Sequence, residues 1–596
     1  MNKLFKVPDL FWLIFTASLA LGIYYQHDTK QFMSPGGAWS DKAGYYIYLP
    51  ALFFYDFDAR KMPPDIDIKT GGGFSVDINS NKIDTKYTYG VALMISPFFG
   101  LAHVVCLISG ISDEAGFSLI YMRMMLLAAV VYLTLGLWLL FRLLSERFSA
   151  TISFMTALLI FLATNLYWYS LIDGLMSHVY SFFLFALFLF SLNQYLKNDW
   201  FVSFAVMAVA LLLAVLIRPT NIVLVSAIFL FDIHNLREVS DRIRKLLQPG
   251  KMLFFLVAAI LIFSPQLIYW NYLSGQWLHF SYKGEGFKNL WSPEMAKVLF
   301  SPVNGLIPFT PLVILMLTGL VMMFYRKAAN RWLILLQFLF VTMVCASWSM
   351  WYFGCSYGQR SFIEYYVYLA FPLAWFLQWM VSQGRGWMKS VFVFLILLTT
   401  YANIRYVSAF YRYDRCWYGS TWDWEAYGRS WAKAGVIAPF SGISSFENDF
   451  ENLAIFPGKR PSLIFTISGQ HSIRSDRERD HLALYEARLY EFEYPWPKFI
   501  DARIYFLRPG KLKTGASLKF SAYSKEREIF TDVVPLDTFL RRSSEWIPVS
   551  ERFIIPDLYD TAMVIRLTLE NPARIPLFAD DLSMKFGYSW KGLSGE

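Results

Sequence analysis

Long apolar stretches recur along the first two thirds of the chain and stop near Val407. Many of them reach the roughly 20 residues that an α-helix needs to cross about 30 Å of hydrocarbon. We therefore predict a polytopic α-helical membrane bundle over residues 1–407, with about eleven spans. The spans are expected near residues 8–25, 116–141, 151–171, 176–196, 200–217, 220–232, 252–271, 305–325, 331–350, 363–381 and 388–407.

After residue 408 the pattern changes to an alternation of apolar and polar residues, interrupted by Gly, Pro, Asn and Asp. This alternation is typical of half-buried strands. It indicates an all-β sandwich over residues 455–596, and the aromatic and charged stretch 408–454 is interpreted as a connector on the membrane surface. The strands are expected at 463–468, 503–510, 517–524, 545–556, 562–571 and 577–588.

The composition agrees with a membrane protein. Of 596 residues, 56% are hydrophobic and 17% are charged, which excludes an ordinary soluble enzyme and a disordered chain. The net charge of +9 comes from basic residues that fall in alternate loops. The positive-inside rule assigns those loops to the cytoplasm, so nucleic-acid binding is not needed to explain the charge. They carry Lys3, Lys6, Arg142, Arg147, Lys197, Arg237, Arg242, Arg244, Lys245, Arg326, Lys327, Arg331, Arg385 and Lys389.

Two segments leave the topology partly open. The first apolar run is either an uncleaved anchor, which we favour, or a signal peptide. Either choice places residues 26–115 outside the cytoplasm as a long first loop. Within this loop, residues 89–110 are apolar, but we interpret them as an interfacial or re-entrant helix, because a further span would invert every later loop against the charge rule. The odd span count then places the C-terminus outside.

The four cysteines predict no thiol or metal chemistry. They lack the CxxC spacing of a zinc or redox site and are too few for a disulfide framework. Whether Cys355 and Cys416 form a pair stays open. The other two are Cys106 and Cys345.

Ionisable residues gather at the outer ends of the predicted spans, where polar side chains are functional candidates. Asp41 and Lys42 precede the aromatic amphipathic stretch 45–57. This arrangement resembles the first outside loop of membrane glycosyltransferases with the GT-C fold, such as the protein O-mannosyltransferases and the aminoarabinose transferases of lipid A. Asp41 matches their acidic position, whereas Lys42 stands where those families usually have a second acid. The alternative is that Asp41 caps a helix.

Three further outer junctions carry candidates. Lys86 begins KYTYGVALMISPFF, which resembles the GT-C pattern leading into a juxtamembrane helix, so it either contacts a lipid phosphate or is an ordinary interfacial lysine. Asp173 and His178 share a proton, bind an acceptor, or form an interfacial hydrogen-bonded pair. Arg218, followed by Pro and Asn that break the helix, binds phosphate or substrate, or extends from a helix end to water.

The most specific candidates lie in SYKGEGF (281–287), SPVNGLIPFTP (301–311) and GCSYGQRSFIEYY (354–366). The pieces NGxxxxTP and S[FY]GQR resemble elements of bacterial GT-C-like proteins, a resemblance that covers roughly residues 35–380. Arg360 could hold a phosphate bidentately, or form an ordinary i,i+4 pair with Glu364. The remaining candidates for donor phosphate or substrate binding are Lys283, Glu285, Asn304, Tyr357 and Gln359.

These residues lead us to expect transfer of a sugar from a polyprenyl-phosphate donor to a hydroxyl of a glycan, lipid or protein. The reaction would take place on the outer side of a bacterial inner membrane. Asp41 would act as the base, the reaction would invert the anomeric carbon, and four cations would hold the phosphate. No cofactor is required, although resemblance to the oligosaccharyltransferase branch leaves a divalent cation near Asp41 open. The rivals are a flippase or transporter of lipid-linked glycans, and a non-catalytic assembly protein. The four cations are Lys86, Arg218, Lys283 and Arg360.

The end of the tail, EWIPVSERFIIP, VIRLTLEN and LFADDLSMKF, resembles the end of carbohydrate-binding modules. The resemblance implies a jelly-roll-like sandwich that positions a glycan, outside the cytoplasm. The alternative is a lid or spacer in which Trp546 is core. Asp580 and Asp581 would then cap a turn or hold a structural calcium.

Overall fold

The computed structural model divides the chain into two compact units, which are described separately. The first unit comprises residues 1–407 and 416–427, and the second comprises 408–415 and 428–596. Most of the predicted connector 408–454, the predicted strand 463–468, Lys283, Cys355 and Cys416 lie outside the described residues. The structure describes residues 7–28, 37–63, 66–77, 80–112, 114–282, 284–354, 356–383, 386–410, 424, 427–428, 431, 445–448, 450, 461–462, 472–475, 480–489, 492, 497, 499–524, 527–555 and 563–587.

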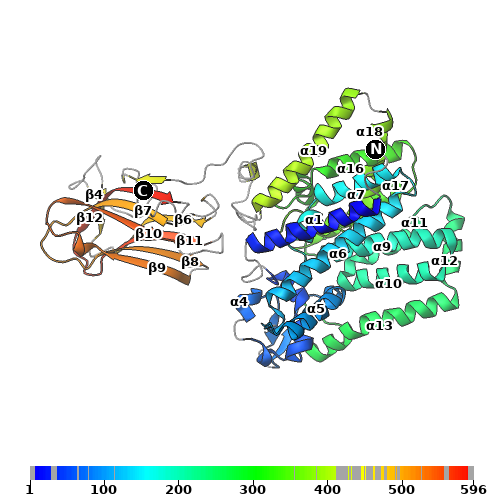
Figure 1. Cartoon of the computed structure of the whole chain (residues 1–596), viewed down its shortest axis with the longest axis horizontal. Helices are drawn as coiled ribbons and strands as arrows, with labels where there is room; N and C mark the ends of the chain where they lie inside the picture. Colours follow the sequence, from blue (N-terminus) through cyan, green and yellow to red (C-terminus); the bar gives the residue numbers. More distant parts are fainter. Residues whose placement is uncertain are drawn as a thin grey trace. The chain divides into compact units, whose positions relative to one another are not determined.

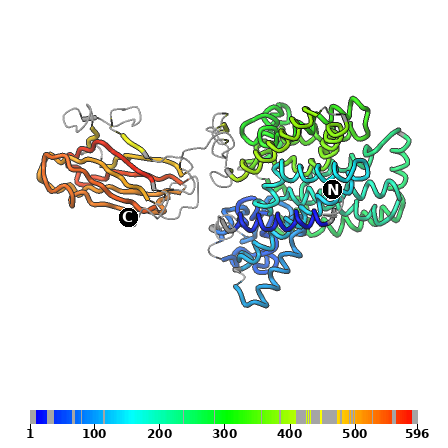
Figure 2. The backbone as a smooth tube through the Cα atoms, turned by 45° about the horizontal axis from the view of Figure 1, so that its top comes forward, coloured from blue at the N-terminus to red at the C-terminus, as the bar shows by residue number. Residues whose placement is uncertain are grey.

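The first unit is a bundle of helices that run side by side (Figures 1 and 2). Each predicted span coincides with helix, although three of the spans are broken. Residues 151–171 form α7 and α8, residues 220–232 form a 3-10 turn and α11, and residues 305–325 form α15 and α16. The helices are α1 Val7–Asp28, α5 Gly90–Ser109, α6 Leu119–Leu144, α7 Ala150–Leu162, α8 Leu166–Leu171, α9 Ser177–Asn198, α10 Phe201–Ile217, α11 Val225–Leu230, α12 Leu236–Leu246, α13 Pro249–Ser274, α14 Met295–Phe300, α15 Leu306–Phe309, α16 Leu312–Tyr325, α17 Arg331–Ser347, α18 Tyr366–Gln383 and α19 Gly386–Ala409.

Among the described residues, five helices are long and apolar enough to cross a membrane: α5, α6, α9, α13 and α19. Six more apolar stretches form helices of 10–17 residues. This is the helical framework of an integral membrane protein. The number of spans stays a prediction, because six of the apolar helices have only 10–17 residues, fewer than the roughly 20 that cross the hydrocarbon core.

The two ends of the bundle differ in charge, and we name them the Ser177 end and the Asn198 end after the limits of α9. Basic residues at the Asn198 end bind the last turns and loops of the bundle. Arg147 contacts Asp232, Lys197 contacts Glu146, and Lys251 contacts Asp199. The described basic loops in these contacts therefore gather at one end, as the alternation along the sequence predicts.

Helix α5 begins at the Ser177 end and extends away from the Asn198 end. It packs along the first half of α6: the Tyr132 hydroxyl donates to Met94 O at 2.9 Å, and His103 Nδ1 lies 2.8 Å from the Tyr121 hydroxyl. The Tyr132 ring also contacts Tyr180, in the first turn of α9. Although α5 is long and apolar enough to be a span, it does not connect the two ends of the bundle.

The first outside loop folds against the Ser177 end through short helical turns, α2 Asp41–Tyr46, α3 Tyr48–Pro50 and a π turn at Ala51–Tyr55. One aromatic face of this stretch is buried, while Leu52 and Phe53 are exposed. The backbone of Gly73 packs directly against the start of this stretch, since a Cβ on Gly73 would lie 1.8 Å from the carbonyl oxygen of Ser40. This close packing positions Asp41, the residue that follows Ser40. The loop also contains α4 Ile66–Thr70 and a hairpin of β1 Ser75–Asp77 and β2 Lys82–Asp84.

The second unit contains two antiparallel sheets around one apolar core. One sheet has the order β10-β7-β12-β5-β4 with β3 paired to β12, and the other has the order β6-β11-β8-β9. Burial alternates along the strands, as in β11, so the predicted β-sheet tail is confirmed. The strands are β3 Ser445–Asn448, β4 Pro461–Ser462, β5 Ser472–Ser475, β6 His481–Arg488, β7 Phe499–Leu507, β8 Ser517–Ser524, β9 Arg527–Pro535, β10 Trp546–Ile554, β11 Val564–Glu570 and β12 Leu577–Gly587.

Five strands of this unit, β3, β4, β5, β6 and β9, do not coincide with the predicted strands. β3, β4 and β5 have at most four residues, too few for a clear alternation. β9 is an edge strand with most residues at least partly exposed, so its apolar alternation is weak. Trp546 is only half-buried at the start of β10 and is not part of the core. Asp580 and Asp581 lie at an irregularity of β12, where the Asp581 amide donates to Asp580 Oδ1.

Close packing of α16 on α18 gives a test of the bundle. A Cβ on Gly319 would lie 1.9 Å from the backbone oxygen of Pro372, and backbone cannot give way as a side chain can. We expect Gly319→Ala to destabilise the bundle by about 1–3 kcal/mol, since overpacking displaces a helix. The matched control is Gly100→Ala in α5, where the added Cβ meets nothing within 4 Å and should stabilise by about 0.5–1 kcal/mol. Thermal unfolding of both variants in the same detergent measures the difference.

Candidate active site

Asp41 lies at the start of α2, at the Ser177 end of the bundle, between two cations. Its Oδ2 accepts a hydrogen bond from Arg360 Nη2 at 2.8 Å, and its Oδ1 lies 3.7 Å from Lys86 Nζ. The alternative that Asp41 caps a helix is wrong, because the N-cap of α2 is Ser40 and no side chain caps that helix. Asp41 instead connects the first outside loop to the loop before α18.

The protonation of Asp41 is decided by competing effects. Burial raises the pKa of its carboxyl, but the charges of Arg360 and Lys86 and hydrogen bonds from Tyr87 and Arg360 outweigh burial, so the pKa is lowered overall. Asp41 is therefore ionised at neutral pH. The same contacts raise the pKa of Arg360 despite its burial, which keeps the guanidinium charged.

Arg360 and Glu364 do not pair with each other, so that alternative is wrong. Residues 360–362 form a 3-10 turn, and α18 begins only at Tyr366, so the i and i+4 positions do not share a helical face. Glu364 pairs with Arg218 instead, with 2.7 Å between Oε1 and Nη1. Each of the two basic residues thus has a carboxylate from a distant part of the chain.

Glu364 is the most deeply buried acid of the site, with its side chain 1% exposed. Arg218, at the end of α10, also donates to Ser361 Oγ at 3.0 Å. His178 Nδ1 lies 3.4 Å from both Glu364 Oε2 and Arg218 Nη1. This buried triad joins α9, α10 and the segment before α18 at one point.

Asp173 and His178 do not form the predicted pair. Asp173 accepts from Lys42 Nζ and from Trp168 Nε1, both at 2.8 Å, whereas His178 faces Glu364. The turn at Gly174 separates the two side chains, since Asp173 precedes the first turn of α9 and His178 lies in it. Lys42 stands where the GT-C families usually have a second acid. It pairs with Asp173, the acid for which the sequence suggested His178 as the partner.

Glu285 completes the cluster from the loop after α13. Its Oε1 lies 3.2 Å from Lys86 Nζ, so Lys86 stands between Glu285 and Asp41. Lys86 also approaches the rings of Tyr87 and Tyr282 at 5.3 and 5.7 Å. Both carboxylates beside Lys86 belong to the candidate site, which favours a role there over that of an ordinary interfacial lysine.

Three predicted substrate residues build the loop that carries Arg360. Asn304 donates to the carbonyls of Tyr352 and Gly354, and Gln359 donates to that of Trp351. Tyr357 is fully buried and its hydroxyl donates to an amide oxygen of α19. Asn304, Gln359 and Tyr357 therefore hold the loop in place, and their side chains are directed into the protein.

An aromatic wall around the charges was not identified from the sequence. Tyr45 stacks on Tyr87 with ring centroids 4.0 Å apart, and Tyr282 meets Tyr87 edge-on. The signal was the tyrosine-rich pattern of the stretch 45–57, which also reads as an ordinary membrane-interface belt. Only the fold separates the tyrosines that face the charges from those that pack elsewhere.

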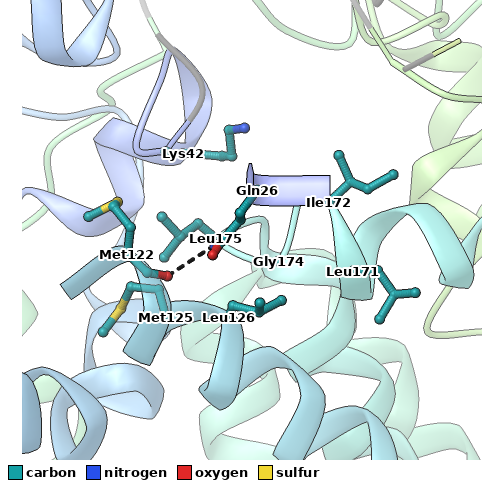
Figure 3. A pocket seen from close by; sticks show the side chains of 10 residues that line it. Gln26, Lys42, Met122, Met125, Leu126, Leu171, Ile172, Gly174 and Leu175 are labelled. Carbon is teal, nitrogen blue, oxygen red and sulfur yellow. Dashed lines mark hydrogen bonds between the residues drawn. The ribbon is translucent and has the colours of Figure 1, made fainter. Parts of the chain in front are cut away.

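A small apolar cavity of about 30 Å³ lies beside this cluster, between α1, α6 and α8 (Figure 3). Lys42 lies at its edge, and Gln26 donates to Met122 O across it at 3.2 Å. The other lining side chains are Met125, Leu126, Leu171, Ile172 and Leu175. The cavity brings apolar surface within reach of the Lys42–Asp173 pair.

The described part of the cluster contains four carboxylates and four cations, which form three sets of ion pairs: Lys42–Asp173, Arg218–Glu364, and Arg360–Asp41–Lys86–Glu285. Among the described residues, no group of three or more His, Cys, Asp or Glu side chains has a geometry that could hold a metal ion. The neighbours of Asp41 are cations, which favour an anionic ligand over a metal ion at this position. A divalent cation near Asp41 does not fit this surrounding.

Comparisons with known proteins give little further guidance. No protein-family model and no curated protein matches the chain. The solved structures that match include the arabinosyltransferase EmbB from Mycobacterium smegmatis, over 99% of this chain, with 12% sequence identity and a TM-score of 0.36. The chain spans 65% of the length of that structure. Similarity at this level assigns no activity, so the function rests on the geometry of the site.

The buried pair of Arg218 and Glu364 predicts a large effect on stability. Glu364→Gln leaves the guanidinium without a counter-charge in a buried position, and we expect a loss of about 3–5 kcal/mol. The control is Glu294→Gln, which breaks an exposed pair with Lys297 and should change stability by less than about 0.5 kcal/mol. Thermal unfolding followed by circular dichroism compares them. Equal effects would show that the Arg218–Glu364 pair does not support the bundle.

Proposed function

We propose that the chain is a membrane glycosyltransferase that transfers a sugar from a polyprenyl-phosphate donor to a hydroxyl acceptor. The observation that carries this proposal is Asp41, an ionised carboxylate held between Arg360 and Lys86 at the mouth of a membrane bundle. A base and two phosphate-binding cations are what sugar transfer from a lipid phosphate requires. Their place at a helix end is one that a lipid-linked substrate reaches without leaving the membrane.

In the proposed reaction, Asp41 accepts the proton of the acceptor hydroxyl while that oxygen forms a bond to the anomeric carbon. The bond from the anomeric carbon to the donor phosphate breaks, and its electron pair leaves with the phosphate. Attack from the face opposite the phosphate inverts the configuration. Arg360 and Lys86 stabilise the charge that develops on the leaving phosphate, and they need no metal ion to do so.

The resting ion pairs also explain how a strongly ionised acid becomes a base. Arg360 and Lys86 lower the pKa of Asp41 when no donor is bound. A donor phosphate that binds the same cations draws them away from the carboxylate, which raises the pKa of Asp41 and increases its basicity. Binding of the donor phosphate would then itself make Asp41 a stronger base.

The arrangement of charge supports an enzyme over a transporter. The charged residues described above lie at the ends of the helices, whereas transporters place their binding sites near the midplane. The basic Asn198 end supports a cytoplasmic position for that end, so we propose that the site faces the extracytoplasmic side of a bacterial inner membrane. The sequence shows no GxGxxG dinucleotide-binding motif, in agreement with a lipid-linked rather than a nucleotide-linked donor.

For the second unit we propose a jelly-roll that positions the acceptor glycan on the same side of the membrane. Its strand order supports the topology, since β5, β7, β10 and β12 share one sheet and β6, β8, β9 and β11 the other. Helix α19 returns to the Ser177 end of the bundle, where Asn403 donates to the carbonyl of Thr164. The chain that follows α19 therefore leaves the bundle at the proposed extracytoplasmic side.

The role of Asp41 is tested by Asp41→Asn in the purified protein. We expect loss of about 10²–10⁴ in turnover with a panel of polyprenyl-phosphate sugars, because the amide cannot accept the proton. The control is Asp56→Asn in the same loop, whose exposed side chain pairs with Lys61 away from the site and should leave turnover unchanged. Turnover above about 1% in Asp41→Asn would remove this residue from the role of base.

The contact with Lys86 predicts a shift in pH dependence. Lys86 lowers the pKa of Asp41, so the ionised form persists below its ordinary range, and activity is lost only as the pH falls through that lowered value. Lys86→Met removes one cation and should move the acidic limb of kcat/KM to higher pH. The matched variant Lys69→Met, outside the site, should not move it. An unchanged acidic limb in Lys86→Met would contradict the proposed coupling.

A further inference from the structure

The segment between α13 and α14, residues 276–294, contacts the site with one side and leaves a different set of residues exposed. On its inner side, Ser281 Oγ donates to Lys86 O at 2.9 Å, and Glu285 pairs with Lys86. Further along, Gly286 and Asn289 exchange backbone hydrogen bonds with residues 347–349. The polar groups of the segment therefore attach it to two loops of the candidate site.

Large apolar side chains occupy the outer side of the same segment. Trp291 is 96% exposed, Leu278 75%, Phe280 71% and Trp277 62%. Four such side chains within 15 residues would be costly in water, and clusters of this kind mark an interaction surface. Tryptophan is also the residue most typical of the boundary between membrane and water.

This surface continues the lipid-facing side of α13. Along that helix the exposed residues are apolar and recur at helical spacing, with Leu253, Leu256, Ile260 and Ile268 among them. The helix reaches from Lys251 at the Asn198 end to Tyr269 and Tyr272, which contact the first outside loop at the Ser177 end. Trp277 follows only three residues after the last residue of α13, Ser274.

We infer that residues 277–282 and 284–291 form a membrane-seated strap, whose aromatic side lies in the headgroup region of the bilayer at the Ser177 end. Bilayer contact explains both the exposure of the apolar side chains and their continuity with the lipid-facing stripe of α13. The strap carries Glu285 and Tyr282 on its opposite side. The bilayer thereby holds Glu285 against Lys86, and the membrane surface becomes one wall of the site.

The strap is tested with the full-length protein in vesicles of phosphatidylethanolamine and phosphatidylglycerol. Trp277→Cys and Trp291→Cys are each labelled with an environment-sensitive fluorophore, and the signal of the unsubstituted chain is subtracted. The matched control is Leu512→Cys in the β unit, a position that is 71% exposed. All three positions are exposed, so the label replaces no core contact.

We expect nitroxide-labelled lipids to quench the fluorophore at positions 277 and 291 at least threefold more than at position 512. Aqueous iodide should quench in the opposite order. Strong iodide quenching at 277 and 291, with lipid quenching no greater than at 512, would overturn the inference. Shielding from both quenchers would also overturn it, because the surface would then be covered by protein instead of lipid.

A second variant distinguishes loss of membrane contact by the strap from unfolding of the bundle. Trp277→Gln with Trp291→Gln introduces polar side chains at two exposed positions, and it should lower lipid quenching of a fluorophore at position 280, placed by Phe280→Cys, by at least half. The thermal midpoint of the bundle should stay within the error of the unsubstituted protein. Unchanged lipid quenching at position 280 would show that the two tryptophans do not seat the segment.

Discussion

At the Ser177 end of the bundle, the buried positive charges must be neutralised by carboxylates, and this requirement determines how the segments there are arranged. Arg218 and Arg360 are enclosed by helix ends and aromatic rings, where an unpaired charge is costly. Each has a carboxylate from a distant segment, Glu364 and Asp41 respectively. These pairs join the first outside loop, the end of α10 and the segment before α18. The position of the proposed base is thus a consequence of where the guanidinium groups lie.

The ion pairs of this cluster differ in how deeply they are buried, and this difference bears on how an anionic ligand could bind. The pair of Arg218 and Glu364 is deeply buried and supported by Ser361 and His178, so it serves mainly to hold the helices together. Lys86 is partly exposed and shared between two carboxylates at 3.2 and 3.7 Å. In the proposed reaction it is this partly exposed cation, rather than the buried pair, that exchanges a carboxylate for the donor phosphate. The buried Arg218–Glu364 pair therefore stabilises the fold, whereas the partly exposed pairs of Lys86 are proposed to bind the donor.

Both ends of the bundle contain ion pairs between basic and acidic side chains, but the pairs are arranged differently. At the Asn198 end, Lys251 and Lys197 bind single acids close to helix termini. At the Ser177 end, Lys86 lies between two acids, and the stacked rings of Tyr45 and Tyr87 lie beside them. The first pattern agrees with the predicted topology, whereas the second concentrates opposite charges at one end of the bundle.

The sequence by itself determined the two-part organisation and the residues available for chemistry. Apolar runs and period-two alternation are local properties, so the helical bundle, the β tail and the gathering of basic loops could be predicted from residue order. The candidates Asp41, Lys86, Arg218 and Arg360 were found because ionisable residues gather at the outer ends of the predicted spans. Only the tertiary structure decided which of these residues meet. The pairing of Arg360 with Asp41 spans more than 300 positions and depends on a 3-10 turn that breaks the expected helical face. Residues such as Asn304 and Gln359 look equally suited to a substrate in the sequence, and burial against backbone carbonyls is a property that only the fold confers.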